Sequence, residues 1–166
     1  MQIIIGVEHK DTDFMYIKEA INYFYCIYGN DIKLTSISLE GKGNFQNKLK
    51  TINNHIHKYE GDSVVVFCLD LDSQLDSTNK ELNKNINDFC RRNNIRLVWF
   101  NEEIEEVFLG YKVEKRKKTN QAIHFIRSNK IKKVPIGNLS NEYFNKISTS
   151  NFLNVFDQII GEFRRK

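Results

Sequence analysis

The residues most able to do chemistry in this sequence are two aspartates that follow a run of apolar residues. The stretch SVVVFCLDLD, residues 63–72, ends in Asp70 and Asp72. The apolar run is typical of a strand buried on both faces, and because side chains alternate along a strand, both carboxylates can point to one side. Close carboxylates repel each other, so a hard divalent cation is their natural partner. Taken alone, the pair is equally consistent with capping or turn roles.

The rest of the chain predicts the elements that would position this pair. Short apolar runs rich in β-branched residues predict strands, at 2–7, 32–39, 63–69 and 95–100. Between and after them, apolar residues recur every three or four positions and predict helices. These helices cover 13–28, 45–56, a stretch from Thr78, 102–109, 119–128, and a stretch from Ser150 or Asn151 to Phe163. Gly29 is the expected C-cap of the first helix, and Thr78 and Glu81 form an expected capping box at the start of the third.

This alternation of strands and helices predicts an α/β fold, with a mostly parallel four-stranded sheet flanked by helices. The length of 166 residues fits a single domain, with a core over 2–110 and a helical C-terminal extension over 111–166. The sequence contains no apolar run of about 18 residues and opens without the features of a signal peptide. We therefore expect a cytoplasmic protein without a membrane span.

Polar residues follow each predicted strand, at the edge of the sheet where ligands bind in open α/β folds. Glu8 follows the first strand, EGKGN the second, the aspartate pair the third, and Asn101 with EEIEE the fourth. Glu8, Asp70 and Asp72 would form a cluster of three carboxylates. Mg²⁺ prefers a few carboxylates together with waters and phosphate oxygens, and such a site serves phosphoryl transfer.

Two further features suit a phosphate-bearing partner. The GKGN loop, residues 41–44, places two glycines and Lys42 before a helix, which allows close approach of the backbone to a phosphate; a simple left-handed turn also explains it. The spacing differs from that of a P-loop. The net charge of +4 is concentrated in runs such as KVEKRKK at 112–118, which suit a polyanion, although a lysine-rich chain carries such runs in any case.

Together, a glutamate after the first strand, a glycine turn after the second and a D-x-D motif after the third resemble the Toprim domain. This is the Mg²⁺-binding module of topoisomerases, bacterial primases and OLD-type nucleases. The resemblance covers about residues 2–110. GVEHKDTDFMYIKEAI is most similar to the opening of the RloB-like and OLD-like branches, EGKGNF to the glycine turn of OLD-type nucleases, and CLDLD to the D-x-D motif.

The resemblance implies roles for particular residues. Glu8 is implied to be a general acid/base or a metal ligand. FNEEIEEVF resembles a segment that carries a ligand for a second ion, which points to Glu105, or to Glu102 in its place. A solvated acidic helix face explains the FNEEIEEVF segment equally well. His9 departs from the glycine usual after the glutamate, and the usual proline near the fourth strand is missing. The implied catalytic residues are Glu8, Asp70 and Asp72, and the implied metal ligands are Glu8, Asp13, Asp70, Asp72 and Glu105.

A lysine often completes sites of the OLD type, and the basic run offers three candidates between which the sequence does not choose: Lys115, Lys117 and Lys118. The run can also contact a nucleic-acid backbone or only solvent. The residues expected to bind nucleic acid are Lys42, Lys115, Arg116, Lys117 and Lys118.

The resemblance implies a Mg²⁺- or Mn²⁺-dependent nuclease acting on DNA or on RNA such as tRNA. Small Toprim proteins of these branches serve in antiphage defence beside an ABC-type ATPase, and this chain has no Walker motif of its own. The alternative is a Toprim-like interaction subunit that binds metal or nucleic acid without cleavage. A receiver-like signalling domain would need an acidic pair after the first strand, where Glu8 stands alone. A homodimer is possible, because the apolar terminal helix and NYFYCIYG can form contacts between chains as readily as a core.

Overall fold

The computed structural model describes residues 1–27, 31–73, 75–144, 146–161 and 164–166. Four strands form one parallel sheet in the order β2-β1-β3-β4. The strands are β1 (Gln2–Val7), β2 (Lys33–Ser38), β3 (Ser63–Asp70) and β4 (Arg96–Phe100). This confirms the predicted α/β fold with a four-stranded sheet flanked by helices.

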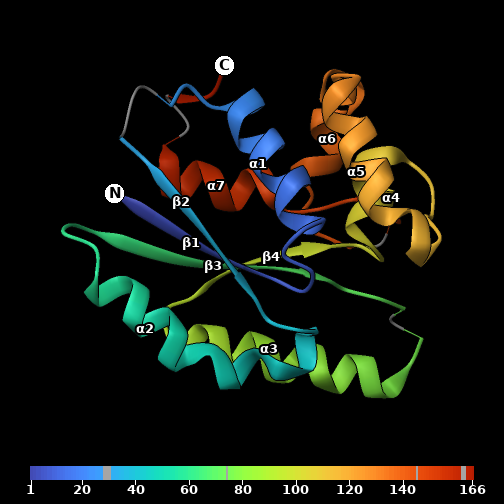
Figure 1. Ribbon diagram of the computed structural model, residues 1–166. Coiled ribbons are helices and arrows are strands. Elements are labelled where there is room, and N and C mark those ends of the chain that lie inside the picture. Colours follow the sequence, from blue (N-terminus) through green and yellow to red (C-terminus); the bar gives the residue numbers. More distant parts are fainter. Residues whose placement is uncertain (28–30, 74, 145, 162–163) are drawn as a thin grey trace.

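The helices cover both faces of the sheet (Figure 1). They are α1 (Asp13–Phe24), α2 (Leu49–His57), α3 (Ser77–Arg92), α4 (Ile104–Leu109), α5 (Lys118–Arg127), α6 (Ile136–Leu139) and α7 (Phe152–Ile160), with 3-10 segments η1 (Lys42–Lys48), η2 (Lys115–Lys117) and η3 (Lys130–Lys133). None of these described helices is long and apolar enough to cross a bilayer.

Side chains on the two faces of the sheet form two hydrophobic clusters. One cluster packs α2 and α3 against side chains such as Phe67, and the other packs α1 and α4 to α7 against side chains such as Val66. The predicted extension belongs to the second cluster, where Phe125, Phe152 and Phe156 are fully buried. The apolar stripe of the terminal helix is therefore core within the described residues, and Phe163 lies outside them.

The end of α1 and the start of α3 differ from the prediction. Helix α1 ends at Phe24, because Tyr25 takes an extended backbone that pairs with Arg165; the expected end at Tyr28 and its cap Gly29 lie outside the described residues. The cap of α3 is Asp76, whose side chain accepts from the Thr78 N–H, so the Thr78–Glu81 capping box is wrong.

At the start of α7, both predicted capping residues are engaged, in different ways. The Ser150 hydroxyl accepts from the Phe152 N–H at 3.1 Å. The Asn151 side chain instead continues the edge of the sheet, where it accepts from the Trp99 N–H and donates to the Leu97 carbonyl. Tertiary contacts with β4 thus decide which side chain caps the helix.

The strand order creates a crevice between β1 and β3. The chain leaves β1 toward β2 through α1 on one face, and leaves β3 toward β4 through α3 on the other. Connections that diverge in this way open a crevice beyond the carboxyl ends of the two strands, which is where ligands bind in such sheets. Glu8 follows β1 directly, and Asp70 is the last residue of β3.

Candidate functional site

Glu8 is held in the crevice by backbone N–H groups from both neighbouring strand ends. Its Oε1 accepts from the Asp70 N–H at 3.3 Å, and its Oε2 accepts from the Lys42 N–H at 3.1 Å. Gly41, with φ of 96°, makes the turn that precedes Lys42. Burial raises the pKa of Glu8 above its usual value, although the two N–H donors oppose the shift. The N–H of the glycine loop, expected to face a phosphate, therefore binds a carboxylate of the protein.

Asp70 is the centre of a group of acidic side chains. Its Oδ1 accepts from the N–H of Ile104, the first residue of α4, at 2.8 Å. Burial raises the pKa of Asp70 well above its usual value, and the negative charges of three neighbours add to this effect: Glu8, Asp13 and Glu105. We call Glu8, Asp13, Asp70 and Glu105 the carboxylate cluster. Four secondary-structure elements bring it together: the ends of β1 and β3, the start of α1, and α4.

The other two members of the cluster come from helices. Asp13 is 5% exposed and accepts from the His9 N–H at 2.8 Å and from the Thr12 hydroxyl at 3.0 Å. Glu105 is fully buried; its Oε2 accepts from Lys118 at 3.0 Å, and its Oε1 has no hydrogen-bond partner among the described residues. Burial raises the pKa of both carboxyl groups.

Lys118 is the lysine of the basic run that reaches the cluster. Its ammonium lies 3.0 Å from a carboxylate oxygen of Glu105 and 3.0 Å from one of Glu103. Burial disfavours the charge of Lys118, but these two carboxylates outweigh it and raise the pKa of the lysine. For Glu103, burial is likewise outweighed by Lys118 and Lys112, which lower its pKa. Of the three lysines between which the sequence did not choose, Lys118 is the one whose ammonium contacts carboxylates of this region.

Asp72 has different partners from Asp70. It lies beyond the end of β3 with φ of 54°, a left-handed conformation that interrupts the alternation of side chains. Its carboxylate contacts the Lys42 ammonium. Lys42, expected to face nucleic acid, is 6% exposed and also donates to the carbonyl groups of Asp70 and Leu71 at 3.1 and 3.4 Å. Lys42 thus ties the glycine loop to the end of β3.

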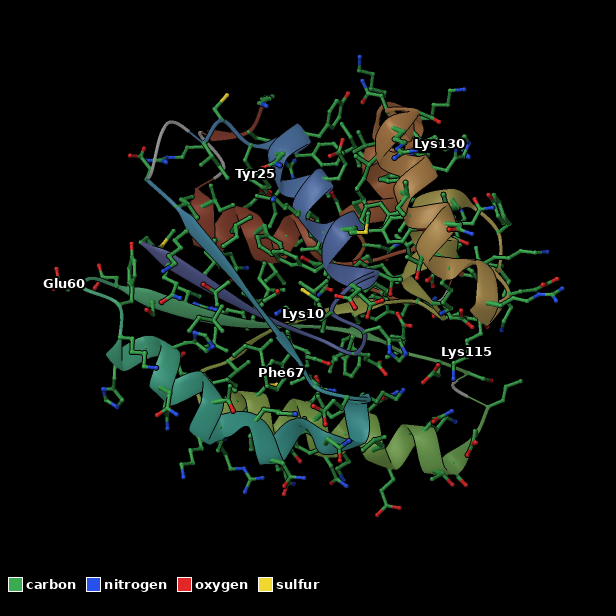
Figure 2. The ribbon with its side chains drawn as sticks, in the orientation of Figure 1. Lys10, Tyr25, Glu60, Phe67, Lys115 and Lys130 are labelled. Carbon is green, nitrogen blue, oxygen red and sulfur yellow. The ribbon has the colours of Figure 1, made fainter. Side chains whose placement is uncertain are left out.

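A groove of about 1160 Å³ adjoins the cluster, between the β1–α1 loop and the segment from Lys112 to Thr119. Its lining includes the basic residues His9, Lys10, Lys112, Lys115 and Lys118 and the acidic residues Asp11, Glu103 and Glu114. Figure 2 shows Lys115 on the side of the molecule where the strands end. Among the other residues expected to bind nucleic acid, Arg116 and Lys117 are exposed and pair with Glu114.

Sequence reasoning missed Lys10, Lys112 and Glu103. Lys112 belongs to the basic run, and Glu103 to the acidic segment, so both carried a compositional signal. Lys10 follows Glu8 by two residues and carried none. Their common position becomes visible only when the β1–α1 loop and the basic segment line the same groove.

The donor set of the cluster suits a hard divalent cation. It offers the oxygens of four carboxyl groups whose pKa values are raised. One of these oxygens, Glu105 Oε1, is buried without a hydrogen-bond partner within the described chain. Mg²⁺ and Mn²⁺ bind such oxygens. As the side chains stand, however, the described residues include no three acidic, histidine or cysteine side chains placed to hold a metal together. The four carboxylates are therefore ligands of the right chemical type for Mg²⁺ or Mn²⁺, but their side chains would have to rotate to hold one ion together.

Comparison with family models, with curated proteins and with solved structures found no match to this chain. The similarity to Toprim domains therefore stays a prediction from the motifs, and the function has to be argued from the site itself.

Proposed function

We propose that this chain is a Toprim-like nuclease that depends on Mg²⁺ or Mn²⁺ and cleaves phosphodiester bonds of nucleic acid. The observation that carries the proposal is the carboxylate cluster at the β1–β3 crevice. Four carboxyl groups with raised pKa values share this place with one lysine, beside a groove whose lining includes further basic side chains. Uncompensated carboxylates at a ligand-binding edge are a marker of a functional site.

The residues have distinct roles in this proposal. Asp70 and Glu8 would hold the ion, with Asp13 and Glu105 completing its surroundings. When bound, the ion supplies charge neutralisation at the scissile phosphate and a bound water of lowered pKa. Lys118 stabilises negative charge on the phosphate, because its ammonium already lies among the acidic side chains.

The remaining roles belong to proton transfer and to substrate binding. Glu8, whose pKa is raised, can move a proton at its carboxylate oxygens. In the groove, Lys10, Lys112 and Lys115 are placed to contact the sugar-phosphate backbone, a contact that favours polyanions without reading their sequence.

We extend the proposal to the cell on the resemblance alone. The chain would act in the cytoplasm as the effector of an antiphage system, activated by a separate ABC-type ATPase, on phage DNA or on RNA such as tRNA. A search for an ATPase gene beside this one tests the partnership without any enzyme assay.

The decisive experiment is a cleavage assay with plasmid DNA and total tRNA, in Mg²⁺ or Mn²⁺, with and without the neighbouring ATPase and ATP. Asp70→Asn and Glu8→Gln should abolish cleavage with the fold intact by circular dichroism. Asp88→Asn is the matched control, since Asp88 is paired with Arg91 on the surface of α3. If the complex is active and Asp70→Asn cuts as fast as wild type, the proposed site is wrong.

A second candidate is an interaction subunit that binds nucleic acid without cutting it. It is favoured by the absence, among the described residues, of a ready-made metal-binding group, and by the contact of Asp72 with Lys42. This candidate predicts that Asp70→Asn and Glu8→Gln leave both nucleic-acid binding and the biological effect unchanged. A gel-shift assay together with a phage-challenge assay of these variants separates the two functions.

A further inference from the structure

Two buried polar atoms beside the site lack a hydrogen-bond partner within the described chain. They are the hydroxyl of Tyr16 and Oε1 of Glu105, and both residues are fully buried. A buried donor or acceptor without a partner destabilises a folded protein. One of these atoms can donate and the other can accept, so one water between them could satisfy both.

The packing of Tyr16 directs it toward the helix faces that carry the site. Its ring stacks on Phe108 of α4, with 5.5 Å between ring centroids and 12° between planes, and contacts Phe125 of α5 at 5.0 Å. Phe108 lies one helical turn after Glu105, so the two share a face of α4. Phe125 lies two turns after Lys118 on α5. Tyr16 is thus held between the two helices that contribute Glu105 and Lys118.

The electrostatics agree with this placement. Burial raises the pKa of the Tyr16 hydroxyl, and the negative charges of Glu105 and Asp13 act in the same direction. The other carboxylate oxygen of Glu105 is occupied by Lys118 at 3.0 Å. A donor on Oε1 would therefore complete the orientation of this carboxylate.

We propose that Tyr16 is a positioning residue of the site, whose hydroxyl donates a hydrogen bond to one buried water that in turn donates to Oε1 of Glu105. With Lys118 on one oxygen and the water held by Tyr16 on the other, the carboxylate is fixed in one orientation while each oxygen keeps a lone pair for a cation. The consequence for metal binding rests on the proposed function; the hydrogen bond itself does not.

Tyr25 supplies a matched control at the far end of α1. It is 1% exposed, and its hydroxyl donates to Asp157 at 2.7 Å. Figure 2 labels Tyr25 well away from the edge where the strands end. Replacing either tyrosine by phenylalanine removes one buried hydroxyl, but only Tyr16→Phe removes it beside the carboxylate cluster.

The experiment measures Mn²⁺ affinity by calorimetry and stability by urea unfolding for Tyr16→Phe, Glu105→Gln, their double variant and Tyr25→Phe. Tyr16→Phe should weaken Mn²⁺ binding about tenfold when Glu105 is present, and less than about twofold in the Glu105→Gln background, as for residues that orient a metal ligand. Tyr25→Phe should lower the urea midpoint and leave Mn²⁺ affinity unchanged.

The outcomes separate this inference from the proposed function. If Tyr16→Phe leaves Mn²⁺ affinity unchanged, or weakens it equally without Glu105, the positioning role is overturned. If wild type binds no Mn²⁺, the proposed function fails. The hydrogen bond is then tested by the double-mutant cycle in urea unfolding alone, which compares the two single variants with the double variant. Coupled effects of Tyr16→Phe and Glu105→Gln on unfolding then support the hydrogen bond, whereas additive effects overturn it.

Discussion

The two aspartates of the CLDLD motif, two positions apart in sequence, have opposite electrostatic surroundings. Asp70 shares its place with the carboxylates of Glu8, Asp13 and Glu105, which together with burial raise its pKa. Asp72 contacts the ammonium of the nearly buried Lys42. The first arrangement keeps like charges together without full compensation, whereas the second is an ion pair. We infer that the Asp70 region is built for a ligand and that the Asp72 region holds a loop.

The difference also separates function from stability. A buried carboxylate cluster opposes folding, because burial and repulsion both disfavour its ionised form. An ion pair at a strand end has the opposite effect, since loss of one partner leaves the other charge without compensation. Substitutions at the two aspartates should therefore move activity and stability in different proportions.

The largest expected effect is on catalysis. Asp70→Asn and Glu8→Gln should each lower the single-turnover cleavage rate by at least about 10³, because they remove proposed metal ligands. Asp72→Asn should lower it only about tenfold, through displacement of Lys42 and its loop. Rates measured in saturating Mn²⁺ test this contrast, and an equal loss for Asp70→Asn and Asp72→Asn would end the distinction between the two regions.

The next effect concerns two adjacent lysines of the basic run, Lys117 and Lys118. Lys118→Met should lower the cleavage rate about 10²-fold, because its ammonium lies at the carboxylates, whereas Lys117→Met should change it less than about threefold. Urea unfolding of both variants checks that the fold persists. A similar loss of cleavage rate for both lysine variants would instead indicate that the lysines attract the polyanion by charge alone. A steep salt dependence of nucleic-acid binding would support that interpretation.

Stability of the metal-free protein should respond with opposite sign at the two aspartates. At pH 8, Asp70→Asn should raise the free energy of unfolding, since it removes a carboxylate whose ionised form burial and neighbouring negative charges disfavour. Asp72→Asn should lower the same free energy by about 1 kcal/mol, because Lys42 loses its partner. Urea unfolding without divalent ions measures both, and destabilisation by Asp70→Asn would contradict the assignment.

The same cluster predicts the pH dependence. Because the pKa values of the cluster are raised on folding, the folded protein binds more protons than the unfolded chain above the ordinary carboxyl range. The contribution of these four groups to the free energy of unfolding is therefore highest below that range and falls as the pH rises through the raised values. Asp70→Asn should flatten this slope when unfolding is followed between pH 4 and pH 8, and Asp72→Asn should not.

A local effect on stability alone concerns the loop that holds Glu8. Gly41→Ala should lower the free energy of unfolding by about 1–2 kcal/mol, because φ of 96° strains any residue with a Cβ, although nothing lies within 4 Å of the added atom. Gly43→Ala is the matched control, since its space is equally open and its φ is not in the left-handed region. Equal losses of thermal stability in the two variants would show that the backbone conformation of Gly41 does not determine the stability of the loop.

Much of the architecture was predictable from local patterns. Apolar runs and helical periods predicted the four strands and most helices, because burial on one face or two leaves a direct trace in the residue order. The helix ends were less predictable. The cap of α3 moved to Asp76, and α1 stopped at Phe24 because Tyr25 pairs with Arg165, a residue from the other end of the chain.

For the candidate site, the sequence by itself determined that Glu8 and Asp70 end neighbouring strands, since both follow apolar runs of a parallel sheet. Only the tertiary structure decided that Lys118 reaches Glu105, that Lys42 is nearly buried, and that Asp72 contacts Lys42. The physical reason is the distance along the sequence over which each property is determined. Strand ends follow from local burial, whereas the partners of a charge depend on how separate helices pack and on single residues, such as Asp72, with φ above zero.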